Sequence, residues 1–223
     1  MRRQLQQGFT LVEIAIVLVI IGLLLGGILK GQEMITQAKI KNVMADFSGI
    51  SAAYHGYQDR YRAIPGDDPG ANARWTLGIA APASGAFGDG VVSGAYNSTI
   101  SNDESRLFWL DLRSAGFVSG TLQQQPFNAV TGMLGVQTGD AAGGPTLTNA
   151  GAGFVGLIIC SANLPDKIAI AVDTQMDDGV PNTGTVRAIL QAAPNPTIGA
   201  GLAAVSPAYL ENGTNIYTLC RSF

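Results

Sequence analysis

The sequence has 223 residues and a mildly acidic charge balance, with a formal net charge of −3. A general nucleic-acid surface would be basic, so this balance argues against DNA or RNA as a partner. Only 13% of the residues are charged and 29 are glycine, a composition typical of a loop-rich extracytoplasmic domain and not of a cytosolic enzyme.

The first predicted element is an apolar helix close to the N-terminus. The run from Ile14 to Leu29 has no charged residue, and Glu13 is the only charge between Arg3 and Lys30. A stretch of about 20 apolar residues is long enough to cross a hydrocarbon core of about 30 Å. An ionisable group inside such a span is costly, so we expect Glu13 to have a partner or a function.

Two common kinds of apolar N-terminal segment fit this run less well. A secretory signal peptide would have the basic start that Arg2 and Arg3 provide, but small residues would follow the run, where Lys30–Glu33 stands instead. An uncleaved membrane anchor would explain the length of the run but would leave Glu13 without a reason.

The six residues from Gly8 to Glu13, Gly-Phe-Thr-Leu-Val-Glu, resemble the processing site of type IV prepilins and of the related type II secretion pseudopilins. In that family a membrane peptidase cuts after the glycine, and the new N-terminal phenylalanine is N-methylated. The resemblance implies a leader over residues 1–8, cleavage between Gly8 and Phe9, methylation of Phe9 and an assembly role for Glu13. A buried carboxylate could pair with the Phe9 ammonium of a neighbouring subunit and fix the register between the two.

The resemblance also implies a function and a location. We expect a structural subunit of a type IV pilus-like filament, with a type II secretion pseudopilin or a minor pilin with a binding head (adhesion or uptake) as alternatives. The implied partners are other pilin subunits, the prepilin peptidase, an inner-membrane assembly platform and membrane lipid. Arg2 and Arg3 predict a cytoplasmic N-terminus. Residues 9–30 would then span the inner membrane once, until the subunit joins a periplasmic or cell-surface filament.

The helical pattern continues in an amphipathic half over residues 31–62. Apolar residues recur there at alternating spacings of four and three, namely Val43, Phe47, Ile50, Tyr54, Tyr57 and Tyr61. This stripe is typical of a packed helix face, and we expect it to cover the sheet of a head over residues 63–223. In the membrane half, Gly22 and Gly26 would allow close approach of neighbouring helices.

The head has signals for turns, short helices and short strands. Two prolines and two glycines end the long helix in Ile64–Gly70, and a Gly-Asp-Gly loop follows within residues 85–94. A short helix is expected around Leu107–Arg113, capped by Asn102 or Asp103. This order of a Pro-Gly-Asp turn, a Gly-Asp-Gly loop and a helix with Glu and Trp also resembles pilin-like heads.

The C-terminal half of the head should be mostly strands. Residues 120–153 are expected to be loops around at most one or two short strands, and residues 166–173 a short helix. Strands are predicted over residues 154–160, 185–190 and 216–220. The predicted fold class is therefore α+β, a pilin fold with a long N-terminal helix packed on a mostly antiparallel sheet.

Cys160 and Cys220 are the only cysteines, and both lie at the ends of predicted strands. Outside the cytoplasm an even pair is expected to form a disulfide, as type IV pilins commonly do near the C-terminus, and two free buried thiols are the alternative. Closing a loop of about 60 residues contributes about 4 kcal/mol in the loop-entropy model.

The acidic stretch over residues 173–182 is the one place that suggests a cofactor. Asp173, Asp177 and Asp178 could gather around Ca²⁺, although their spacing does not match an EF-hand loop. The alternative is a helix end followed by an Asp-Gly turn. The sequence has no catalytic motif that we recognise, and its one histidine, His55, has no partner at ligand spacing, so no catalytic residue and no enzyme is expected.

Overall fold

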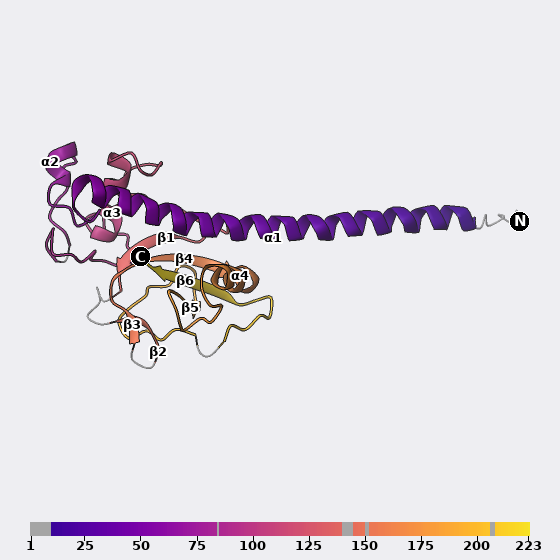
Figure 1. The fold of residues 1–223 in the computed structure, drawn as a ribbon. Helices are drawn as coiled ribbons and strands as arrows, with labels where there is room; N and C mark the ends of the chain where they lie inside the picture. The colour runs from indigo at the N-terminus through magenta and orange to yellow at the C-terminus, as the bar shows by residue number, and fades with distance from the viewer. Residues whose placement is uncertain (1–9, 84, 140–144, 150–151, 206–207) are drawn as a thin grey trace, which may run out of the picture. The chain divides into compact units, whose positions relative to one another are not determined.

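The computed structural model describes residues 10–83, 85–139, 145–149, 152–205 and 208–223. The chain divides into two compact units, Met1–Ala38 and Lys39–Phe223. The long helix α1, Leu11–Tyr61, contributes to both units (Figure 1).

In the first unit α1 is apolar and exposed. Its most apolar 18-residue window is long enough to cross a membrane, and none of that window is buried. A Cβ added at Gly22 or Gly26 would meet no atom within 4 Å. Close helix packing at these two glycines therefore stays a prediction.

In the second unit the C-terminal part of α1 is packed along one face. The buried residues of α1 are Ile40, Val43, Phe47, Ile50, Ala53, Tyr54 and Tyr57. Tyr61 is partly buried and packs against the same core. This confirms the predicted apolar stripe. The helix ends at Tyr61 because Arg62 adopts a left-handed conformation, with φ of 57°, and Pro65 follows.

Three shorter helices follow α1, namely α2 Ala71–Trp75, α3 Glu104–Ser114 and α4 Asp166–Met176. The sequence predicted α3 and α4 but not α2. Asp103 takes the N-cap position of α3 without a side-chain cap hydrogen bond. Its carboxylate accepts a hydrogen bond from the Ser98 hydroxyl instead, so the expected capping bond is not made.

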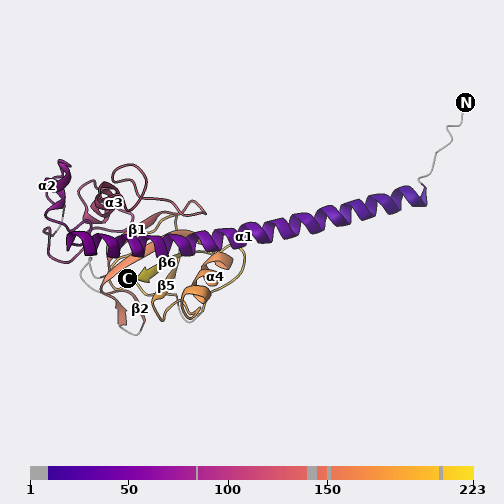
Figure 2. The same cartoon turned by 45° about the horizontal axis from the view of Figure 1, so that its top comes forward.

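The main sheet has the strand order β1-β4-β6-β5; all four strands are labelled in Figure 1, and β1, β6 and β5 again in the turned view of Figure 2. Every pairing in this sheet is antiparallel. Its strands are β1 Leu134–Thr138, β4 Leu157–Pro165, β5 Val186–Leu190 and β6 Ile216–Ser222. A separate two-stranded sheet pairs β2 Thr146–Asn149 with β3 Ala152–Phe154. The α+β class with a mostly antiparallel sheet is confirmed.

The predicted strand over residues 154–160 is wrong at its start. Phe154 ends β3, and Val155 and Gly156 separate it from β4, which runs on to Pro165. The run Phe154–Cys160 is apolar throughout, so its composition does not mark the break. Pairing decides it, because Leu157 is the first residue of β4 with a partner in β1.

Side chains of the main sheet contribute to two cores. On one side Val136, Ile159 and Leu219 pack with Phe47 and Tyr57 of α1, and α3 and α4 contribute to the same cluster. The other cluster contains Ile158, Cys160, Ile189 and Cys220 together with Leu147 and Ile198. Neighbouring residues such as Ile158 and Ile159 thus belong to opposite faces, as the two-residue period of a strand requires.

Candidate functional site

The predicted processing site, Gly8 and Phe9, lies outside the described residues, which begin at Thr10. The carboxylate Oε2 of Glu13 accepts hydrogen bonds from the Thr10 backbone N–H at 2.8 Å and from the Thr10 hydroxyl at 2.7 Å. The Thr10 hydroxyl in turn accepts a hydrogen bond from the Glu13 N–H at 3.3 Å. This reciprocal pair is a capping box, which satisfies N–H groups that the first turn of a helix leaves free.

The capping box gives Glu13 a partner that the sequence analysis missed. The signal was present, because a threonine followed three residues later by a glutamate before an apolar run is the signature of this motif. The assembly role of Glu13 stays a prediction. A neighbouring ammonium would have to share or replace the hydrogen bonds that Thr10 now donates.

Cys160 and Cys220 form a disulfide across the main sheet. They lie directly opposite one another in the pairing of β4 with β6, and both side chains are fully buried. The bond therefore links two strands that are 60 residues apart in the sequence.

The predicted calcium ligands Asp173, Asp177 and Asp178 lie together, with ligand oxygens within 4.8 Å of one another. We call them the C-terminal cluster. Burial raises the pKa of Asp173 to about 6, against a hydrogen bond from the Tyr209 hydroxyl that lowers it. Asp177 accepts the Val186 N–H at 2.8 Å, as expected of a carboxylate that organises a turn. Calcium at this cluster stays a prediction.

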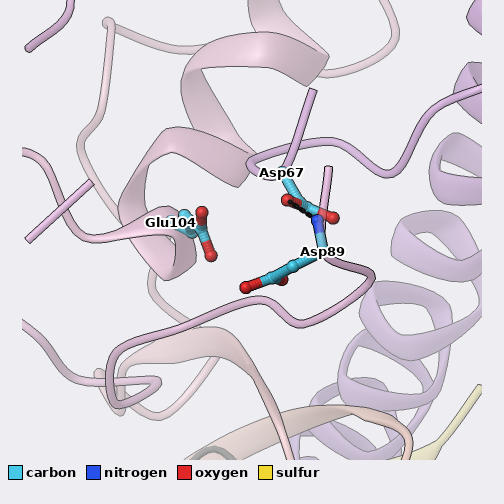
Figure 3. A group of neighbouring side chains, drawn as sticks. All are labelled: Asp67, Asp89 and Glu104. Carbon is cyan, nitrogen blue, oxygen red and sulfur yellow. Dashed lines mark hydrogen bonds between the residues drawn. The ribbon is translucent and has the colours of Figure 1, made fainter. Parts of the chain in front are cut away.

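A second acidic group, which the sequence analysis did not anticipate, joins Asp67, Asp89 and Glu104. We call it the loop cluster. Its three carboxylates point toward one another, with ligand oxygens within 4.8 Å (Figure 3). Asp67 and Glu104 are buried, whereas Asp89 is exposed.

Glycines allow the loop that carries Asp67 to lie against the start of α3. Gly66 has a φ of +87°, and a Cβ there would overlap the Glu104 carbonyl oxygen, so only glycine fits. Asp67 then accepts N–H hydrogen bonds from Gly88, from Asp89 at 3.3 Å and from Gly90 at 2.8 Å. The Asp67 carboxylate thereby holds the Gly-Asp-Gly loop beside the loop that carries Asp67.

Glu104 begins α3 and is fully buried. Its Oε2 accepts the Ser93 N–H at 2.8 Å, whereas its Oε1 is buried without a hydrogen-bond partner. Burial raises the pKa of Glu104 to about 7, and the negative charges of Asp67 and Asp89 act in the same direction. The ordinary hydrogen bonds of the head thus leave one buried carboxylate oxygen of this cluster unsatisfied.

Further buried acids fix the turn after α1. Asp68 accepts hydrogen bonds from the Tyr57 hydroxyl at 2.7 Å and from Arg74 at 2.8 Å, the latter an ion pair. Asp111 of α3 accepts the Gly66 N–H at 2.7 Å. These bonds tie the turn and α2 to the core, a structural role that needs no ligand.

A hollow beside β5 and β6 offers no acid or base. Its lining includes Thr131, Asn163, Gln191 and Asn215, and it has no titratable side chain. Asn163 and Gln191 hydrogen-bond each other, with the Gln191 amide donating to the Asn163 carbonyl at 3.0 Å. Two of the polar side chains that line this hollow are therefore already paired with each other.

Residues 3–29 match the family model of the prokaryotic N-terminal methylation motif. Among curated proteins, a search found no match to this chain. The matched residues include the predicted cleavage and methylation positions, Gly8 and Phe9, and also Glu13. The methylation motif, placed at the start of a long apolar helix, supports a type IV pilin-like or pseudopilin protein.

Proposed function

We propose that this chain is a structural subunit of a type IV pilus-like filament. Its leader, residues 1–8, is removed by a prepilin peptidase, and Phe9 becomes the methylated N-terminus. Residues 9–30 hold the subunit in the inner membrane, with the N-terminus on the cytoplasmic side, until an assembly platform adds it to the filament.

The observation that carries this proposal is the exposed apolar surface of α1. Large apolar side chains there keep about half or more of their surface exposed, with Leu11 at 86%, Leu23 at 73% and Leu29 at 66%. Apolar surface left in water costs roughly 25 cal/mol per Å², so this segment needs another apolar environment. Lipid supplies it before assembly, and the same helix of other subunits supplies it afterwards.

The motif supports the same order of events. Cleavage after Gly8 would create an ammonium group on Phe9, four residues before the carboxylate of Glu13. Pairing of Glu13 with the Phe9 ammonium of a neighbour is a head-to-tail contact between identical chains. Such a contact does not close on itself, so it generates a helical filament of open length.

Deleting and restoring the coding sequence in the cells that produce the chain tests the proposal. We expect the deletion to remove surface filaments seen by electron microscopy, and the wild-type chain to restore them. A variant with Gly8→Asp, which blocks the predicted cleavage site, should stay in the membrane and form no filament. Loss of secreted enzymes without any loss of surface filaments would contradict the proposal and favour a secretion pseudopilin.

A further inference from the structure

We propose that the loop cluster, Asp67, Asp89 and Glu104, binds a divalent cation of the size and preference of Ca²⁺. Calcium takes about six to eight oxygen ligands and accepts carboxylates through one or both oxygens. The three carboxylates already face one another, with ligand oxygens within 4.8 Å (Figure 3). Water can complete the shell at Asp89, which is the exposed member.

Glu104 distinguishes this site from an ordinary group of surface acids. Its side chain is fully buried, points at Asp67 and Asp89, and keeps Oε1 without a hydrogen-bond partner (Figure 3). Buried carboxylate oxygens are normally paired, because an unpaired buried charge is expensive. A cation between the three carboxylates would give this oxygen its partner and offset the repulsion among them.

Basic side chains do not supply the missing positive charge. Among the described residues, the two salt bridges join Lys30 to Glu33 and Arg74 to Asp68. Neither involves a member of the loop cluster. Within that part of the chain the three acids therefore face one another without an ion-pair partner.

The supporting backbone favours calcium over magnesium. Asp67 and Asp89 lie on loops, and Glu104 is the first residue of α3. Ligands from three separate segments make an irregular shell, which Ca²⁺ accepts, whereas Mg²⁺ demands near-ideal octahedral geometry. The bound cation would tie together the turn after α1, the Gly-Asp-Gly loop and the start of α3.

A proton is the alternative way to neutralise the cluster, since a protonated Glu104 could donate to Asp67 or Asp89. The two possibilities are separated by adding the metal alone. Purified full-length chain in detergent micelles would be stripped with chelator, then titrated with CaCl₂, followed by calorimetry and thermal unfolding. MgCl₂ at equal concentration serves as the ionic control.

We expect calcium at ten times its dissociation constant to raise the folded-to-unfolded ratio roughly tenfold, which is a rise in melting temperature of about 3–6 °C. Glu104→Gln should abolish this shift and remove one bound calcium per chain. The variant should still fold, because the glutamine carbonyl can accept the Ser93 N–H and its amide can donate to Asp67 or Asp89.

Glu211→Gln is the matched control, because it makes the same substitution at an exposed glutamate outside both acidic clusters. It should keep the rise in melting temperature that calcium causes in the wild type. A wild-type melting temperature that does not change at millimolar calcium would overturn the proposal, as would full calcium binding by Glu104→Gln. Both results are independent of filament assembly, so they test the site apart from the proposed function.

Discussion

Glu13 already has a hydrogen-bonding role within its own chain. Its carboxylate caps the start of α1 through Thr10, and the matched motif includes both residues. A test of Glu13 in assembly therefore has to distinguish two properties of its side chain. One is the hydrogen bonding of the cap, and the other is the negative charge. Glutamine can replace glutamate in a capping box but carries no charge.

We predict that Glu13→Gln and Glu13→Ala are both cleaved normally after Gly8 but are both incorporated poorly into filaments. The expected loss is about tenfold or more, because a hydrogen bond between charged groups contributes about 1.5–3 kcal/mol. The measurement compares cleaved subunit in the membrane with subunit in sheared filaments. Normal incorporation of Glu13→Gln, with a defect only in Glu13→Ala, would show that the cap and not the charge is needed.

Asp111 is the residue whose ionisation should be visible in the stability of the head. Burial raises the pKa of Asp111 to about 7, and the nearby charge of Asp68 acts in the same direction. The folded chain therefore holds a proton on Asp111 at pH values where the unfolded chain has lost it. Its contribution to stability is fully present below about pH 4 and is lost as the pH rises toward 7.

We predict that Asp111→Asn flattens the pH dependence of stability. One such proton contributes a slope of about −1.4 kcal/mol per pH unit between these limits. Asparagine resembles the protonated acid and can still accept the Gly66 N–H. Urea unfolding at pH 5 and pH 8 should show a smaller difference for the variant than for the wild type. An equal difference in the two proteins would contradict the raised pKa.

At the scale of elements, the sequence predicted the structures whose signals are local. The alternating spacing of apolar residues predicted the buried face of α1, and β-branched runs predicted β5 and β6. The five-residue helix α2 was missed, because it is too short for a periodic signal and ends at Thr76 in a left-handed conformation. The start of β4 was misplaced, because only its pairing with β1 sets it.

The candidate sites differ in the same way, because only residues close together in the sequence could be predicted to lie together. Asp173, Asp177 and Asp178 lie within six residues, so their proximity was predictable from the sequence. Asp67, Asp89 and Glu104 come from two loops and a helix, and tertiary packing around Gly66 brings them together. Their turn and loop motifs were visible in the sequence, but periodicity and spacing carry no signal for contacts between them.

The disulfide links β4 to β6, and its contribution to the free energy of unfolding can be measured. Replacing both Cys160 and Cys220 by alanine should lower the free energy of unfolding by about 2–5 kcal/mol, because the bond closes a 60-residue loop and both side chains are buried. Urea unfolding of the oxidised wild type and the double variant checks this. Labelling of two thiols in unfolded protein that was purified without reductant would contradict the disulfide.

Across the whole molecule, the two units differ in whether their apolar side chains are buried or exposed. Residues 39–223 bury an apolar core of their own, whereas the apolar side chains of α1 between Leu11 and Leu29 are exposed. An apolar segment of this length is long enough to cross a membrane, and the methylation motif lies at its start. A filament subunit that is first stored in a membrane, as proposed, accounts for both the buried core and the exposed apolar helix.

Leader cleavage and methylation can be tested by the mass and N-terminal sequence of the protein purified from its own cells. We expect a chain that begins at Phe9, lacks residues 1–8 and carries one methyl group on its N-terminal amine. A mature chain that still begins at Met1, or that begins beyond Lys30, would contradict this expectation.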